Sequence, residues 1–151
     1  MTLARLHLIK LSVGSESVET LADWQARRLQ QEGRLWHATR MTPRRREELL
    51  DPAAPGSIYW VIGGLIQARQ QLLGIESDLD REGRKRCLLL LDPKLVRVEP
   101  QPMRPFQGWR YLAPEKAPAD LKSRGGGLAE GGPEEGMPPK LLAELRSLGI
   151  L

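Results

Sequence analysis

The sequence predicts one small α+β domain, with a mixed or antiparallel sheet of about five or six strands curled toward a β-barrel and with flanking helices. Three observations support this fold class. The chain has 151 residues, of which 40% are hydrophobic and 28% charged, as in a globular domain that buries a core. Residues 57–62 are rich in β-branched and aromatic side chains, which are typical of strands. Residues 18–29 carry apolar side chains at helical spacing.

The first elements are a strand over residues 6–13 and a long helix. Apolar residues dominate both faces of the strand, and Gly14 ends it. Ser15 or Ser17 can cap the helix, and Gly33 suits its carboxyl end. The inward stripe of this helix comprises Val18, Leu21, Ala22, Gln25 and Leu29.

A strand, a short helix and a second strand follow. Residues 35–40 form a short segment with aromatic and β-branched side chains, which predicts a strand. Thr42 and Pro43 predict an N-cap followed by proline at the first helical position, with the helix continuing over residues 44–50. Proline and glycine then turn the chain into the strand at 57–62.

Residues 65–73 fit either a helix or a strand. A helix would leave Arg69 on the buried stripe, whereas a strand would continue the even-numbered face that starts at Ile58. We therefore favour the strand. As a strand, this segment projects Gln67, Arg69 and Gln71 from one face as a polar row that could line a groove.

The rest of the body is predicted to be a hairpin and an extended connection. A turn at residues 80–83 joins the two hairpin strands, and residues 95–99 alternate as another strand. Prolines at 100, 102 and 105 then hold the chain extended. The predicted body spans residues 1–116, a Gly/Pro-rich linker spans 117–138, and an amphipathic helix over 139–151 docks on the body or on a partner.

The composition excludes several classes of protein. One cysteine and two histidines rule out an intrachain disulfide and a zinc cluster, so no metal is expected. No apolar run reaches the roughly 20 residues that span a bilayer, and His7 and Lys10 interrupt any signal-like segment. We expect a cytoplasmic protein with no membrane partner. The net charge of +4 favours a polyanionic partner.

The arginines and aromatic residues predict a non-catalytic module that binds RNA or another polyanion. Arginines cluster at residues 40–46, and residues 103–111 combine arginines with aromatic rings that can stack on bases. Each cluster also has a purely structural interpretation, as a solvated face or as a connection that seals the core. The predicted binding face comprises Arg40, Arg44, Arg45, Arg46, Arg69, Arg104 and Arg110, with Trp36 and Trp109 as stacking surfaces.

Two other functions stay open. A small enzyme acting on a nucleotide or nucleic acid could use His37 as general acid or base, with Arg40 and Arg69 holding an anion. The common nucleophile, zinc-protease and phosphate-loop motifs do not occur, and no cofactor is expected. A protein-interaction module could instead use the helix at 139–151.

The segment 104–112 is predicted to have two roles. Its prolines exclude it from a central strand, so it should run along the outside of the sheet. We expect Phe106 and Tyr111 to seal the open end of the barrel, and Arg104 and Arg110 to lie beside the groove.

Several segments together resemble a family of small bacterial proteins of unknown function. They are residues 6–11, 39–43, 57–62, 68–70 and 104–112. The resemblance covers most of the chain and implies a bacterial protein, but it supplies no activity. At the level of element order, the sequence is also similar to PUA-like barrels of the ASCH type, which often act on RNA; any function taken from that similarity is analogy.

Overall fold

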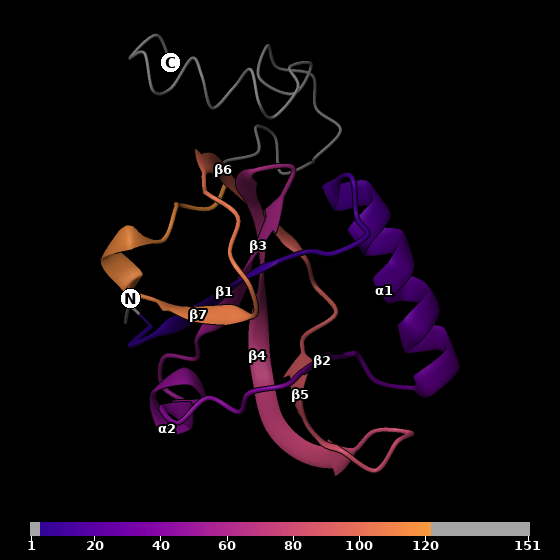
Figure 1. Ribbon diagram of the computed structural model, residues 1–151. Helices are drawn as coiled ribbons and strands as arrows, with labels where there is room; N and C mark the ends of the chain where they lie inside the picture. The colour runs from indigo at the N-terminus through magenta and orange to yellow at the C-terminus, as the bar shows by residue number, and fades with distance from the viewer. Residues whose placement is uncertain (1–3, 122–151) are drawn as a thin grey trace, which may run out of the picture.

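The computed structural model describes residues 4–121, which form a seven-stranded mixed sheet accompanied by α-helices (Figure 1). In this part of the chain no helix has the length and apolar character needed to cross a membrane. The strands are β1 (His7–Leu11), β2 (Trp36–Thr39), β3 (Ser57–Ile62), β4 (Leu65–Leu79), β5 (Lys85–Leu91), β6 (Val96–Pro102) and β7 (Trp109–Leu112); the helices are α1 (Val18–Glu32), α2 (Arg46–Leu49) and the 3-10 turn η1 (Pro114–Lys116).

The sheet is organised around the long strand β4. The strand order is β2-β5-β4-β3-β1-β7, with β6 attached to β4 off this path. The first part of β4 pairs with β3 and β6, and its second part pairs with β5 in the predicted hairpin. The pairing of β1 with β3 is parallel, and the other pairings are antiparallel. Strands β2 and β7 therefore lie at the two ends of the path.

The sheet is not closed into a barrel, so the expected PUA-like barrel is not supported. The β2 and β7 ends approach each other without forming a ladder. Two bonds join them instead: the Trp109 indole N–H donates to the Met41 carbonyl at 2.8 Å, and the Arg45 amide donates to the Tyr111 hydroxyl at 3.1 Å. The Thr39 hydroxyl donates to the same Met41 carbonyl at 3.0 Å. Side-chain hydrogen bonds, and not a backbone ladder, therefore connect these two ends.

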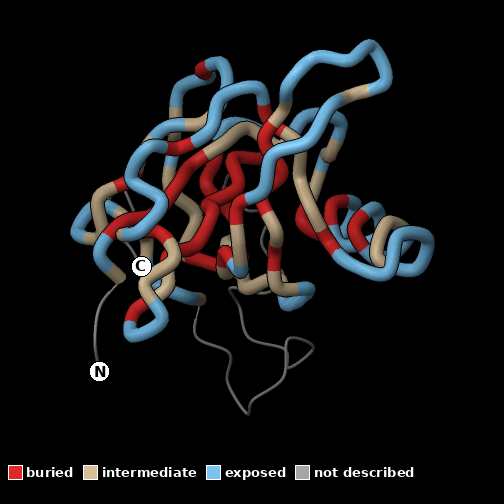
Figure 2. Tube along the Cα trace, turned by 90° about the horizontal axis from the view of Figure 1, so that it is seen from below, coloured by how far each residue is buried: buried red, intermediate tan, exposed pale blue. Residues whose placement is uncertain are grey.

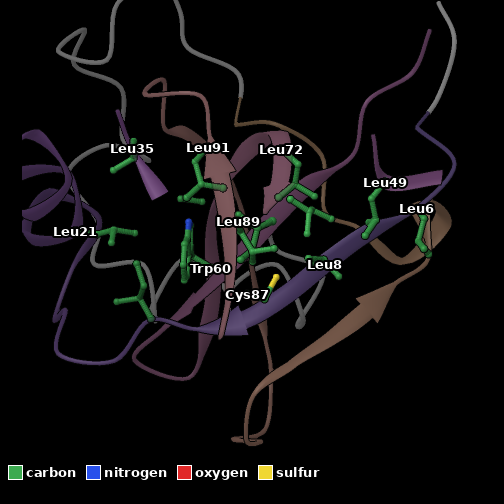
Figure 3. Close-up of a cluster of buried hydrophobic side chains, with 14 of the residues drawn as sticks. Leu6, Leu8, Leu21, Leu35, Leu49, Trp60, Leu72, Cys87, Leu89 and Leu91 are labelled. Carbon is green, nitrogen blue, oxygen red and sulfur yellow. The ribbon is translucent and has the colours of Figure 1, made fainter. Parts of the chain in front are cut away.

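Apolar side chains form a separate core on each face of the sheet. The first core surrounds Trp60 and includes α1 residues such as Leu21, together with Leu35 and Leu89 (Figure 3). Burial is concentrated in the middle of the molecule, as the red segments in Figure 2 show. All six residues of β3 are buried, because the strand has a core on both faces. The second core comprises Ile9, Tyr59, Val61, Ile66, Val98, Phe106 and Leu112.

Helix α1 begins and ends where the sequence predicts. The Ser17 hydroxyl accepts a hydrogen bond from the Thr20 amide at 3.1 Å, and Gly33 adopts a left-handed conformation with φ of 79°. The buried stripe is narrower than expected: Val18, Leu21 and Gln25 are buried, whereas Ala22 is exposed. One edge of α1 thus contacts the sheet, and Trp24 beside it stays 54% exposed.

Helix α2 is shorter than the predicted helix, and the predicted Thr42 cap is wrong. The helix starts at Arg46, with Arg45 at the N-cap position and no side-chain cap. Pro43 is fully buried in the core, so it does not open an exposed first turn. The Arg45 amide is already bound by the Tyr111 hydroxyl. Arg44 consequently precedes the helix.

Residues 65–73 form a strand, as favoured, but the predicted polar row is not formed. The β3–β4 register shifts between Trp60 and Val61, opposite a bulge at Gln67, and this reverses which side chains face each core. Ile66 therefore lies in the second core and Ala68 in the first. The Gln67 amide donates to the Ile62 carbonyl at 2.7 Å.

The segments beyond β5 also differ from prediction. Strand β6 includes Pro100 and Pro102, which a strand at the rim of a sheet tolerates, so this stretch is not merely a connection. Residues 117–121, assigned above to the linker, lie along β6: the Glu99 amide donates to the Ala119 carbonyl at 2.9 Å. The helix predicted over 139–151 and the rest of the linker lie outside the described residues.

Phe106 and Tyr111 do not seal one end together. Phe106 belongs to the second core, whereas Tyr111 packs against the first core from the opposite face of the sheet. The predicted exclusion of segment 104–112 from a central strand agrees with β7, which pairs with β1 at the end of the sheet.

Candidate functional site

The predicted arginine face does not form one continuous surface of free cations. Several of its members contact groups of the protein itself, and carboxylate partners offset their charge. These contacts are Arg40 with Asp80 at 3.5 Å, Arg45 with Glu48 at 2.7 and 2.9 Å, Arg46 with the Ile75 carbonyl at 2.6 Å, and Arg69 with Asp120 at 2.6 and 2.7 Å.

The arginines around β7 do not form a common surface with Trp109. Arg44, Arg104 and Arg110 are exposed. The Arg110 guanidinium lies over the Phe106 ring, 4.7 Å from its centroid, on the side of the second core. Neighbouring residues of a strand point to opposite faces, so Arg110 and Trp109 are directed apart.

The predicted stacking residues, in contrast, line two hollows on either side of β2. The first, the α1 hollow, has a volume of about 380 Å³ and lies between α1, the loop after β1, and β2. Its lining includes Ser12, Ser15, Leu21, Trp24, Gln25, Arg28, Leu35, Trp36, His37, Trp60, Arg86 and Leu91.

The second hollow, the β7 hollow, has a volume of about 480 Å³ and lies where β1 and the start of β7 face the end of β2. Both hollows include Ala38 in their lining, and we refer to the pair as the β2 groove. The β7 hollow is lined by Lys10, Ala38, Thr39, Arg40, Met41, Gln107, Gly108 and Trp109.

The β2 groove combines tryptophan rings with positive charge. The protein has four tryptophans, and all of them line the groove. Among the described residues that line it, none is an aspartate or a glutamate. Four cationic side chains do line it, and two of them have carboxylate partners: Arg86 pairs with Asp78 at 2.6 Å, and Arg40 contacts Asp80 at 3.5 Å. The other two are Lys10 and Arg28.

Arg28 is held flat between two tryptophan rings. Its guanidinium carbon lies 4.6 Å from the Trp24 ring centroid and 4.3 Å from the Trp36 ring centroid. It also donates to the Trp36 carbonyl at 3.2 Å. The Arg86 guanidinium carbon lies 5.1 Å from the Trp36 ring centroid, so two arginines contact the tryptophan rings of the groove. No carboxylate of residues 4–121 forms an ion pair with Arg28, although Glu32 is near enough to stabilise its charge.

Lys10 contributes a second uncompensated cation. It lines the β7 hollow, and burial lowers its pKa from the ordinary value. No carboxylate of the described chain forms an ion pair with it. A partly desolvated ammonium without a partner is unfavourable, and a bound anion would offset that cost.

His37, the candidate acid or base, lies at the boundary between the α1 hollow and the first core. Its ring meets Trp60 edge to face at 5.0 Å, and its Nε2 atom is buried without a partner among the described residues. Burial and the charges of Lys10 and Arg28 lower the pKa of His37 to about 4. The ring is therefore neutral at pH 7, a poor base with one nitrogen covered, and this geometry favours binding over acid–base catalysis.

His7, the other histidine, has a structural role. Its Nδ1 atom accepts a hydrogen bond from the Ser57 amide at 2.9 Å, and its ring lies against Tyr59. Within residues 4–121, no group of three or more His, Cys, Asp or Glu side chains is arranged to hold a metal ion.

The lowered pKa values of His7 and His37 predict that the folded protein loses stability in mild acid. Burial lowers the pKa of His7 and of His37 from 6.5 to about 4, with Arg69 adding to the effect at His7. Between pH 6.5 and pH 4 the unfolded chain therefore binds protons that the folded chain does not, and the free energy of unfolding falls as the pH is lowered. Each histidine contributes at most about 1.4 kcal/mol per pH unit.

Urea unfolding at pH 7.5, 5.5 and 4.5 measures this effect. His7→Asn places a neutral acceptor where Nδ1 accepts from the Ser57 amide but cannot be protonated, so it should flatten part of the profile. A free energy of unfolding that stays constant across this window would show that neither histidine is kept neutral by the fold.

The sequence analysis identified Trp36, Trp109, Arg40 and His37 in the groove but missed other members. Arg28 follows Trp24 by four residues on α1, a spacing that puts both side chains on one helix face. Gln25 was assigned to the buried stripe, where an amide needs a polar partner, and that requirement was the available signal. Nothing in the sequence pattern indicated that Lys10 would reach the same site.

Comparison with known protein families gives a match. Residues 8–151 match the family described as "Protein of unknown function (DUF1489)". Neither the curated proteins nor the solved structures gave a match. Because the family match spans nearly the whole sequence, the chain belongs to the DUF1489 family, in agreement with its resemblance to a family of unknown function.

Proposed function

We propose that the protein is a non-catalytic module that binds single-stranded nucleic acid along the β2 groove. The observation that carries this proposal is the lining of the groove: the partly exposed rings of Trp24, Trp36 and Trp109, two cations without a carboxylate partner (Lys10 and Arg28), a third (Arg40) whose carboxylate partner lies 3.5 Å away, and no acidic side chain among the described lining residues. An anionic ligand with flat rings complements such a surface.

Single-stranded nucleic acid meets both requirements at once. Its unstacked bases stack on aromatic rings and on arginine planes, as the Trp24–Arg28–Trp36 arrangement offers. Its phosphates provide anions for Lys10 and Arg28, which have no ion-pair partner in the described part of the chain. A duplex keeps its bases stacked on each other and offers no free ring to the tryptophans.

The proposal narrows the set of residues predicted from the sequence. It keeps Trp36, Trp109 and Arg40, and it adds Lys10 and Arg28. The other predicted arginines do not line the groove.

The salt dependence of binding tests this function. With Lys10, Arg28 and Arg40 contacting phosphates, the logarithm of the association constant should fall with the logarithm of salt concentration at a slope of about −2, from about 0.7 per phosphate. Fluorescence anisotropy of labelled single-stranded RNA and DNA oligonucleotides measures the slope. Arg28→Ala should make the slope shallower by about 0.7.

Arg81→Ala is the matched control, because Arg81 is exposed at the turn between β4 and β5 and does not line the groove. This variant should keep the wild-type slope. Binding that is insensitive to salt, or an equal effect of both substitutions, would contradict the proposed function.

A further inference from the structure

We infer that the α1 hollow receives one base of the bound strand and that Gln25 reads the hydrogen-bonding edge of that base. The inference rests on the proposed function and adds a base preference and the residue that sets it. It is supported by the buried pair of side-chain amides of Gln25 and Gln70. All hydrogen-bonding groups of the Gln70 amide have partners, whereas the Gln25 amide has one donor and one acceptor site without a partner in the described chain.

Gln70 is the amide with no remaining capacity. It is fully buried, and its Oε1 accepts from the Gln25 Nε2 at 2.7 Å and from the Trp60 indole at 2.8 Å. Its Nε2 donates to the Gln25 Oε1 at 2.7 Å and to the Asp92 carbonyl at 3.1 Å. Two acceptor sites and two N–H groups are all that a glutamine side chain offers, so Gln70 holds Gln25 without being able to bind a ligand.

Gln25 is the amide with spare capacity. It uses one N–H and one acceptor site of its oxygen in the pair with Gln70, and the other N–H and acceptor site have no partner in the described chain. Gln25 lines the α1 hollow, and 8% of the residue remains exposed. The pairing fixes the plane of the amide, so these free groups have a set direction before a ligand arrives.

The surroundings of Gln25 suit a neutral ring better than a phosphate. Leu21, Leu91 and Trp60 form apolar parts of the lining, and Figure 3 shows them continuous with the first core. The unpaired cation of this hollow, Arg28, lies over the Trp24 and Trp36 rings, and the Trp24 ring, which is 54% exposed, leaves surface on which a base can stack. A base held by stacking is then read by hydrogen bonds to its edge.

A panel of single-stranded oligonucleotides tests the inference. Homopolymers of each of the four bases and an abasic oligomer of equal length are compared at one salt concentration. The wild-type protein should bind the best base about tenfold more tightly than the worst, within the range for a hydrogen-bonded base contact. Gln25→Met should reduce this ratio to less than about twofold, and leave the affinity for the abasic oligomer unchanged, because the methionine side chain cannot distinguish base edges.

Two further variants are compared with Gln25→Met. Gln30→Met changes an exposed glutamine of the same helix and should keep the full preference. Gln25→Glu exchanges the amide nitrogen for an oxygen. It keeps the bond from the Gln70 amide, loses the bond to Gln70 Oε1, and presents an acceptor where the free donor was, so in a protein shown to be folded by thermal unfolding it should change which base is preferred. In the wild-type protein, the Gln25 side-chain amide signals in NMR should shift with the preferred homopolymer and not with the abasic oligomer.

The outcomes separate this inference from the proposed function. Equal affinity for all four homopolymers, or Gln25 amide signals that respond equally to the abasic oligomer, would overturn the reading role while leaving nucleic-acid binding in place. A wild-type protein that binds none of the oligomers would overturn both.

Discussion

Trp36→Ala is expected to weaken binding of single-stranded oligonucleotides about tenfold or more. Trp36 is the centre of the stack in the α1 hollow, with Arg28 at 4.3 Å and Arg86 at 5.1 Å from its ring. Removing an aromatic platform typically costs about 1–3 kcal/mol per base in such sites. The truncation also releases Arg28, which loses one of its two aromatic neighbours. Fluorescence anisotropy at constant salt measures the effect.

The conservative variant Trp36→Phe separates stacking from folding. Phenylalanine keeps a ring for the base and for Arg28, so most of the affinity should return. Both variants should keep β2 in place, since the strand is held to β5 by backbone pairing, and thermal unfolding checks this. Unchanged affinity in a folded Trp36→Ala protein would rule out stacking in the α1 hollow.

Phe106→Ala is expected to lower the free energy of unfolding by about 3–5 kcal/mol, the range for a buried aromatic side chain. Phe106 is 8% exposed and belongs to the second core, where Ile9, Tyr59 and Leu112 surround it. The remaining second core cannot fill the space, because it consists of strand residues fixed by pairing. Urea unfolding gives the free energy directly. A change below about 1 kcal/mol would mean that Phe106 is not a core residue.

Arg110→Ala is the control for Phe106→Ala. Its side chain is exposed and lies over the Phe106 ring, so its loss should lower the free energy of unfolding by less than about 0.5 kcal/mol. Because Arg110 does not line the β2 groove, oligonucleotide binding should also stay unchanged. The sequence-based hypothesis, which placed Arg110 beside the groove, expects weaker binding, so the same variant distinguishes the two accounts.

The sequence predicted the elements whose start, end and type are determined by residues close together in the chain. The Ser17 cap and Gly33 define α1 within a short stretch of chain, and the pattern of residues 57–62 predicted a strand, which the structure shows to be buried throughout. The strand over residues 65–73 followed from the misplaced Arg69 of the helical alternative. In each case the decisive groups are close in sequence.

The remaining features depend on contacts between distant residues. Because of the bulge at Gln67, Ile66 points to the second core and not to the first, and no pattern in the nearby sequence predicts this bulge. Helix α2 is shortened because Pro43 is buried and a tyrosine far along the chain binds the Arg45 amide. The sheet is open because β2 and β7 do not pair, whereas element order alone had suggested a barrel.

The candidate site was partly predictable for the same reason. Trp36, Trp109 and Arg40 were identified as residue types that nucleic acid recognises. The sequence could not show that Lys10 lines the same hollow as Trp109, since the two meet only through the pairing of β1 with β7. Nor could it show that Asp120 pairs with Arg69 and offsets its charge.

The most direct test of nucleic-acid binding in the β2 groove is an NMR titration that follows the four tryptophan indole N–H signals. On addition of a single-stranded oligonucleotide, the signals of Trp24, Trp36 and Trp109 should shift, because these side chains line the groove and are at least partly exposed. The Trp60 signal should change least, because Trp60 is buried and its indole N–H donates to the Gln70 side chain. The NMR signals of the backbone amides of the second core, including that of Val98, should not shift. Indole signals that remain unchanged at saturating oligonucleotide, or shifts confined to the second-core face, would contradict this account.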